Sequence, residues 1–221
     1  MTAHTGLRWL PLGAVAGPIL LTLAWLGLGF VSPGYSLWGT QIAPYSAISQ
    51  PLSGLGLGPT GPYMNAAFIL SGLLIIAGVA GIVRAIPEVE VRRRWVIGAL
   101  LMLPGFGSIL DGIFTLESFL MHFVGFILAL STIVGFPVFG FSLRRVPQLR
   151  AIGRWLIAAG PVTLALAALY FLTFTPTVEG VQIGIAGLTE RILVVELQAT
   201  YALLGWLAFR RSSQNTRLAF N

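Results

Sequence analysis

Few ionisable residues fall inside or at the edges of the long apolar segments of this chain, and they are the ones that could do chemistry there. They are Asp111, Glu117, His122, Glu190, Arg191 and Glu196. A charged side chain is costly to place among apolar groups, so such residues commonly mark binding sites, proton relays or ion pairs. Two places stand out: the short connection between residues 111 and 122, and the start of the last apolar segment.

Asp111 and His122 flank the connection 115–118, which joins two apolar segments. A tight hairpin makes the two segments antiparallel neighbours, and a facing carboxylate and imidazole can exchange a proton with a substrate. Both residues are therefore candidate catalytic groups. Ser49 and Ser53 would supply the hydroxyl of a serine hydrolase, although the sequence has no Gly-x-Ser-x-Gly motif.

Glu190 and Arg191 open the last apolar segment. Two interpretations of them stay open. In the first, Asp111 and Arg191 form an ion pair between the third and sixth segments, and Glu190 stabilises the start of its helix through the helix dipole. In the second, the ionisable residues converge on one binding site. The candidate ligand-binding residues are then Ser49, Ser53, Asn65, Asp111, His122, Glu190, Arg191 and Glu196.

Glu196 lies about 12 Å along that segment, given a helical rise of about 1.5 Å per residue. A lone carboxylate at the centre of a membrane costs at least ~2.5–3.5 kcal/mol, so we expect Glu196 to face the protein interior, to be paired or to hold a proton. At about 100° per residue it points about 140° away from Arg191, whereas Gln198 shares the face of Arg191. Asn65 fits a hydrogen-bonding role at a helix start.

The composition argues against a metal or cofactor site. The chain contains no cysteine, and His122 is the one histidine in these segments, so a zinc site would depend mostly on carboxylates. No P-loop, dinucleotide-binding or haem-attachment motif is present. We therefore predict no metal and no cofactor.

Six apolar segments must position these side chains. They span residues 9–31, 63–83, 95–114, 119–143, 155–174 and 188–209. Each is long enough to cross a hydrocarbon layer of about 30 Å. With 56% hydrophobic and 9% charged residues, the chain is unlike a soluble domain, where charged residues make up about 25%. The sequence predicts an all-α polytopic membrane protein, with residues 1–221 forming one domain of six transmembrane helices.

Twelve of the thirteen arginines lie in alternate connections or at the chain ends. Cytoplasmic loops are rich in Arg and Lys, so this pattern predicts that both termini are cytoplasmic and that the protein is multi-pass in the plasma membrane, as in a bacterial inner membrane. The net charge of +6 is explained by these juxtamembrane arginines, so we expect membrane lipids and not nucleic acid as partners. The oligomeric state stays open.

The connection 32–62 is expected on the outer side and carries no charge, but it contains three aromatic residues. Disordered segments are usually charged and poor in aromatics, and an ordered loop of this length is commonly functional. We expect it to fold back as a lid over the outer face or partly to re-enter the membrane. Ser46, Ser49 and Ser53 have the spacing of one face of a short helix, which Pro51 would limit.

Three stretches together resemble the bacterial "domain of unknown function 998" family of six-span membrane proteins. Residues 45–56, continued by Asn65 and 68–72, look like the Ile-Ser…Ser-Glu-Leu-Gly…Asn pattern at the start of the family's second span. Residues 107–114 followed by His122 resemble its Gly-Ile-Phe-Pro…His hairpin. Residues 187–192 are similar to its Gly-x-x-Glu-Arg start of the sixth span.

This resemblance covers most of the chain and implies a six-span fold but no reaction. It also suggests that one outer-face cluster contains Ser53, Asp111, His122, Glu190 and Arg191. Gly54 replaces a Glu of the family pattern and Thr115 replaces a Pro, and the missing Glu weakens an enzyme interpretation.

Three functions are compatible with these patterns. The leading one is a non-enzymatic membrane protein that binds a lipid or small amphiphile at the polar cluster. The second is a solute-binding subunit of a multi-component importer. The third is a lipid-directed enzyme that uses Asp111 and His122 as acid and base.

Overall fold

The computed structural model describes residues 7–175 and 183–218 and contains six helical segments long and apolar enough to cross a membrane. They are Leu10–Val31, Gly58–Arg84, Val91–Ile113, Leu116–Leu143, Pro147–Thr173 and Ala186–Gln214. The predicted all-α fold of six membrane-length helices is therefore confirmed. Which side of the membrane the termini occupy stays a prediction.

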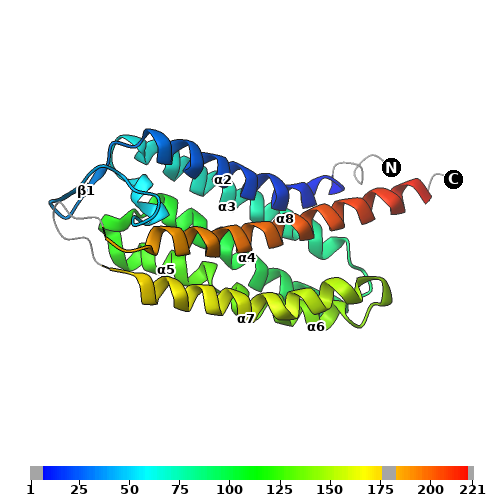
Figure 1. Cartoon of the computed structure of the whole chain (residues 1–221). Coiled ribbons are helices and arrows are strands. Elements are labelled where there is room, and N and C mark those ends of the chain that lie inside the picture. The colour runs from blue at the N-terminus through cyan, green and yellow to red at the C-terminus, as the bar shows by residue number, and fades with distance from the viewer. Residues whose placement is uncertain (1–6, 176–182, 219–221) are drawn as a thin grey trace.

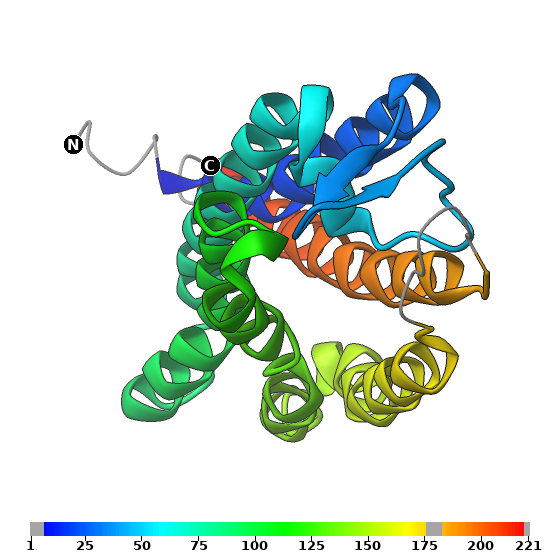
Figure 2. The same ribbon diagram turned by 90° about the vertical axis from the view of Figure 1, so that its left-hand side faces the viewer.

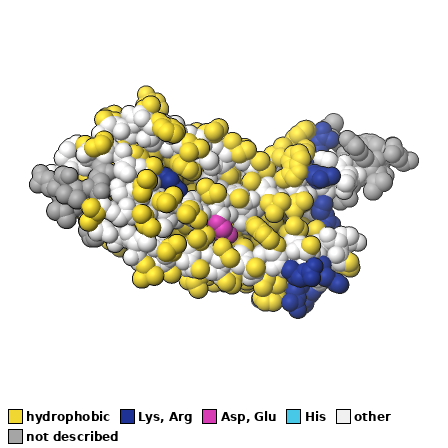
Figure 3. All heavy atoms as spheres, viewed as in Figure 1, with side chains coloured by type: hydrophobic (Ala, Val, Ile, Leu, Met, Phe, Trp, Pro, Cys, Tyr) yellow, Lys and Arg dark blue, Asp and Glu magenta, His cyan; other side chains and the backbone are white. Residues whose placement is uncertain are grey.

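The six segments form one elongated bundle (Figure 1). The helices are α2 Gly13–Val31, α3 Gly61–Arg84, α4 Val91–Ile113, α5 Phe119–Ala129, α6 Thr132–Leu143, α7 Arg150–Thr173 and α8 Ala186–Leu218. Short 3-10 turns flank them: η1 Leu10–Leu12, η2 Leu52–Gly56, η3 Gly58–Thr60, η4 Leu116–Ser118 and η5 Pro147–Leu149. The basic side chains gather at the end where α2 begins and α8 ends, here called the arginine end (Figure 3). The opposite end is the lid end.

Glycines allow the first helices to pack backbone against backbone. A Cβ at Gly78 of α3 would lie 2.1 Å from the backbone nitrogen of Ala14 in α2, and a Cβ at Gly72 would lie 2.4 Å from the carbonyl oxygen of Gly105 in α4. Lipid tails are as apolar as leucine, so membrane helices are held together by such close packing more than by hydrophobic burial. The α2–α3–α4 layer is thereby a tight support for the site.

The fourth span, predicted over 119–143, consists of two helices separated by a short break. Helix α5 ends at Ala129 and α6 begins at Thr132. Around the break the backbone switches to tighter bonds, such as Ile133 N–H to the carbonyl of Leu130. The Thr132 hydroxyl donates to the carbonyl of Ala129 at the break, and the Ser131 hydroxyl donates to the carbonyl of Leu100 in α4. Pro137 lacks the N–H that would bond back to residue 133. As a result α5 packs on α4, whereas α6 packs on α7.

Residues 32–60 fold over the lid end and are called the lid. The lid starts with an antiparallel hairpin of β1 Tyr35–Leu37 and β2 Thr40–Ile42, and continues into η2 and η3. Figure 2, which looks onto this end, shows the lid lying over α2, α3 and α8. All five residues of η2 are buried, so this turn is wedged between the helix ends. Residues 32–60 therefore fold back over the helix ends, while the choice between an outer lid and partial membrane re-entry stays a prediction.

One local feature of the lid was not predicted, and one differs from the prediction. The hairpin turn has positive φ at Trp38 and Gly39, which is the backbone conformation that two-residue hairpin turns need. Trp is an unusual residue at such a position, so the sequence did not indicate this turn. The serines do not share a helix. Ser46 starts a single turn that ends before Pro51, while Ser53 belongs to the separate turn η2.

Candidate functional site

A cavity of about 110 Å³ lies inside the bundle beneath the lid, between α2, α3, α4, α5, α8 and η2. Five polar lining residues come from the lid end of these elements, and Gln198 lies deeper: the five are Ser53, Ser108, Asp111, His122 and Glu190. Toward the arginine end the lining becomes apolar, with Ile75, Pro104, Leu130, Leu197 and Tyr201. The Tyr201 hydroxyl donates to the carbonyl of Leu101 at 2.7 Å and is thereby occupied at the deep end.

Asp111 and His122 face each other across the α4–α5 hairpin. Oδ1 of Asp111 lies 3.5 Å from Nδ1 of His122, and the same Nδ1 lies 2.8 Å from the carbonyl oxygen of Phe114. A neutral imidazole with its proton on Nδ1 satisfies that carbonyl, which leaves Nε2 as an acceptor; this tautomer is assigned from the hydrogen bond. Among the described residues, Oδ1 of Asp111 is buried without a hydrogen-bond donor.

A glycine in α5 makes room for the Asp111 carboxyl group. A Cβ at Gly125 would lie 2.1 Å from Oδ1 of Asp111 and 2.9 Å from the carbonyl oxygen of Gly107. Any larger residue at this position would push the two helices apart or displace the carboxyl group. Gly125 is therefore part of the site although it carries no side chain.

Arg191 binds the lid. Its Nη1 donates to the carbonyl oxygens of Ala47 at 2.8 Å, Gln50 at 3.1 Å and Gly187 at 2.8 Å, and its Nη2 donates to the Tyr45 hydroxyl. The guanidinium is buried, and it can be buried because these oxygens and the tyrosine replace its water.

The predicted ion pair between Asp111 and Arg191 is wrong. The lid folds onto the start of α8 and offers carbonyl groups within reach of the guanidinium, whereas Asp111 faces His122. The ring of Trp25 in α2 adds a cation–π contact 5.5 Å from the Arg191 guanidinium carbon. Arg191 consequently does not line the cavity.

The first turns of α8 hold the main chain of the lid. Oε2 of Glu190 accepts a 2.5 Å hydrogen bond from the N–H of Leu52, and the N–H of Leu188 donates to the carbonyl of Ile48 at 2.9 Å. A Cβ at Gly187 would lie 2.2 Å from the carbonyl oxygen of Gln50, so only glycine fits there. Gly187, Leu188, Glu190 and Arg191 are called the lid latch.

Two buried tyrosines complete the lid side. The Tyr35 hydroxyl donates to Oε1 of Gln50 at 2.7 Å, and burial raises the pKa of Tyr35. Burial also raises the pKa of Tyr45 to about 12, although the charge of Arg191 and its hydrogen bond act in the opposite direction. Both phenols therefore stay protonated at neutral pH and stabilise the lid through hydrogen bonds.

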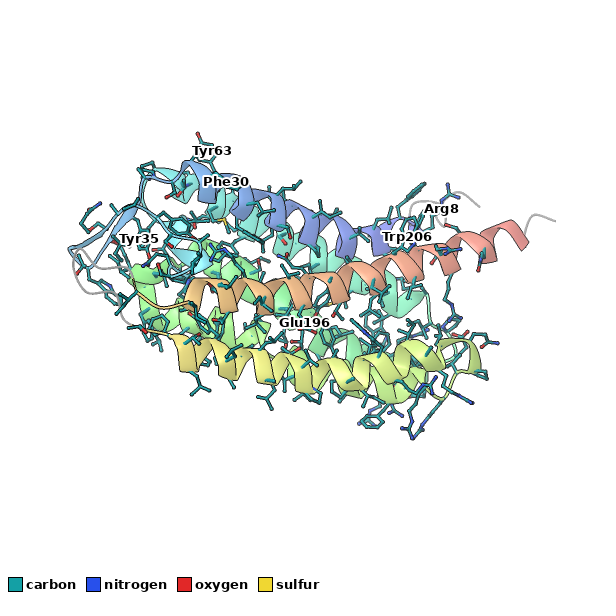
Figure 4. The ribbon with its side chains drawn as sticks, in the orientation of Figure 1. Arg8, Phe30, Tyr35, Tyr63, Glu196 and Trp206 are labelled. Atoms are coloured by element: carbon teal, nitrogen blue, oxygen red, sulfur yellow. The ribbon has the colours of Figure 1, made fainter. Side chains whose placement is uncertain are left out.

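Glu196 does not join this cluster, so the prediction of one shared site is wrong for this residue. Oε2 of Glu196 accepts from the Thr163 hydroxyl of α7 at 2.9 Å, and the side chain lies between α7 and α8 in Figure 4. In the same orientation, Figure 3 shows an acidic side chain at that place, surrounded by hydrophobic surface. The carboxylate at the middle of the span is thus hydrogen-bonded by a neighbouring helix, not by the cavity.

Two further predicted residues lie close to the cavity without lining it. Nδ2 of Asn65 donates to the carbonyl of Gly56 at 3.1 Å and fixes the end of η2. Ser49 is buried in the lid. Of the predicted ligand-binding residues, Ser53, Asp111, His122 and Glu190 line the cavity itself.

The sequence reasoning missed Ser108 and Phe126 as lining residues. Helical spacing could have found them, because Ser108 lies one turn before Asp111 and Phe126 one turn after His122. It also missed Gln50, whose carbonyl oxygen and side chain both serve the lid; its place depends on how the lid folds.

In the described ranges 7–175 and 183–218, no three His, Asp or Glu side chains come together as a metal site would need. Glu179 lies outside these ranges.

A family model described as "Protein of unknown function (DUF998)" matches residues 14–207. No curated protein and no solved structure matches the chain.

Proposed function

The chain belongs to this family of proteins of unknown function, and from that premise we propose that this integral membrane protein binds a lipid or small amphiphile in the cavity beneath its lid. The observation that carries the proposal is the polarity gradient along the cavity. Polar groups gather at the lid end and apolar groups at the deep end. A molecule with a polar head and an apolar tail matches this gradient.

The distance between the polar and the apolar end of the cavity matches a short apolar tail. Glu190 and Tyr201 both line the cavity and are eleven residues apart on α8, a distance of about 16 Å along the helix. The space of about 110 Å³ is somewhat smaller than a cavity of about 150 Å³ that admits benzene. The cavity as it stands therefore accommodates a group no larger than benzene, such as part of the chain of an amphiphile, and it must widen to take a whole one.

The latched lid favours access from the bilayer. The ring of Phe126 lines the cavity and also packs against Tyr170 and Phe171 of α7, with ring centroids 5.7 Å apart in each pair. Phe171 is about half exposed on the lipid-facing surface. We propose that the ligand passes between α5 and α7, where these rings can move aside without opening the lid.

Filling the cavity tests the proposal. Ala129→Phe places a ring in the cavity, whereas Ile127→Phe adds the same ring two residues away on the exposed face of α5. We expect native mass spectrometry to show amphiphile adducts on the parent protein and on Ile127→Phe, and to lose them in Ala129→Phe. A parent protein that retains no adduct and gains no thermal stability from single-chain amphiphiles would overturn the proposal.

A second candidate function is a lipid-directed enzyme. The observation in its favour is that Asp111 and His122 lie 3.5 Å apart and that the hydroxyl-bearing Ser53 lines the same cavity. Hydrolysis of an octanoate ester that stops in both Asp111→Asn and Ser53→Ala, with binding retained, would support it. Equal rates in these variants and in a no-protein control would rule it out.

A further inference from the structure

We infer that the head group bound at the lid end of the cavity is an ammonium group, and not a carboxylate or phosphate. The inference rests on the proposed amphiphile binding and goes on to name the ligand class. It follows from which hydrogen-bonding groups of the cavity are already occupied.

The nearby cation is already engaged with the lid. Nη1 and Nη2 of Arg191 donate to three carbonyl groups and to Tyr45, and its Nε is buried without a partner in the described part of the chain. Arg191 does not line the cavity. Among the described lining residues there is no Arg or Lys. The described side chains of the other arginines belong to the far end of the bundle. An anionic head group would therefore meet no positive charge from the cavity wall.

The polar groups at the lid end offer acceptors. Ser108 donates its hydroxyl hydrogen to the carbonyl of Phe68 at 2.7 Å, so its lone pairs remain available. His122 uses Nδ1 toward the carbonyl of Phe114 and presents Nε2 as an acceptor. Asp111 and Glu190 accept through their carboxyl oxygens, and Oδ1 of Asp111 is buried without a donor among the described residues.

Two lining groups can donate: the Ser53 hydroxyl at the lid end, which can also accept, and the amide of Gln198, which lies deeper. Oε1 of Gln198 accepts from Thr22 at 2.5 Å, while Nε2 of Gln198 is buried without a partner in the described part of the chain. Gln198 follows Glu190 by about two helical turns, beyond the polar end. It is placed to meet a hydroxyl or carbonyl on the tail and not the head group.

An ammonium group matches this arrangement both in charge and in hydrogen bonding. It carries three donors and no acceptor. Its N–H groups can bond to the carboxyl oxygens of Asp111 and Glu190 and to Nε2 of His122, and its positive charge favours the ionised form of a nearby carboxyl group. An alcohol head supplies one donor and no charge, so it should bind with intermediate strength.

Three ligands with the same tail test the inference: octylamine, octanol and octanoate at pH 7.5, with affinities measured calorimetrically on the full-length protein in nanodiscs. We expect octylamine to bind at least about tenfold more tightly than octanoate, with octanol between them, since charged hydrogen bonds are the stronger ones. Octanoate binding as tightly as octylamine would overturn the head-group inference but leave amphiphile binding intact. No binding of any of the three would instead overturn the proposed function.

A charge-removing variant sharpens the test. Asp111→Asn should weaken octylamine binding about tenfold and leave octanol within about twofold. The matched control is Glu117→Gln, which removes an exposed negative charge at the same end of the bundle without altering the cavity. Equal loss of octylamine affinity in both variants would show a general surface-charge effect and overturn the inference. The comparison of the three ligands on the parent protein decides the question even if Asp111→Asn does not fold.

Discussion

Oδ1 of Asp111 and Nδ1 of His122 lie 3.5 Å apart across the α4–α5 hairpin, at a point where α5 carries a glycine. The carboxyl group occupies the volume that a side chain at Gly125 would take. The acid–imidazole pair therefore depends on the close approach of two helix backbones as much as on its own two side chains.

Gly125→Ala should destabilise the protein and disturb this pair. The new Cβ would lie 2.1 Å from Oδ1 of Asp111, and overpacking of this kind typically costs about 1–3 kcal/mol. Thermal unfolding in detergent should show the loss. In an Asp111→Ala background the same change should cost less, because the clashing carboxyl group is gone. Gly27→Ala is the control, since a Cβ there meets nothing within 4 Å; equal effects at both glycines would contradict the explanation.

Arg191→Lys should loosen the lid while keeping the charge. A lysine ammonium is a compact donor that cannot reproduce the planar fork that binds three carbonyls and Tyr45. Hydrogen bonds to charged groups contribute about 1.5–3 kcal/mol, so amide exchange in residues 45–52 should speed up by roughly 10- to 100-fold. Hydrogen exchange with mass spectrometry measures this. Arg154→Lys, at the arginine end, should leave the lid unchanged; unaltered exchange in Arg191→Lys would show that the latch is not what holds the lid.

Lid stability should fall at high pH through Tyr45. The folded pKa of this phenol is raised from 10.0 to about 12, so the unfolded state loses its proton first as pH rises. The stabilisation is therefore fully present below pH 10 and is lost between about pH 10 and pH 12. Thermal unfolding midpoints across this interval should decline, and less steeply in Tyr45→Phe. An identical slope in the two proteins would exclude Tyr45 as the cause. Tyr35, whose pKa is also raised, should account for part of the remaining slope.

Linking α5 to α7 should slow ligand uptake if the ligand passes between them. The chain has no cysteine, so the pair Phe126→Cys and Phe171→Cys can be joined by a short thiol-reactive cross-linker without competing sites. We expect slower octylamine binding in the cross-linked protein than in the same variant before cross-linking, with the lid still protected from exchange. Unchanged uptake kinetics would place the route elsewhere.

The sequence was sufficient for the six spans because length and hydropathy decide which segments cross a membrane. The sequence also predicted that Asp111 and His122 lie close together, because a short hairpin places its two helices side by side. The partners of Arg191 could not be foreseen. They are mainly backbone carbonyls, which every residue carries, and only the fold of the lid determines which of them meet the guanidinium. The break in the fourth span could not be predicted either, since serine and threonine, the residue types at positions 131 and 132, also occur in unbroken helices.

At residues 130–131 the fourth span changes its main neighbour from α4 to α7. Just before this break α5 meets α7 through the rings of Phe126, Tyr170 and Phe171. Rotation of these side chains would widen the space beside Phe126 while each hydrogen bond of the lid latch stayed in place, so the protein could admit a guest through its side and keep its lid closed.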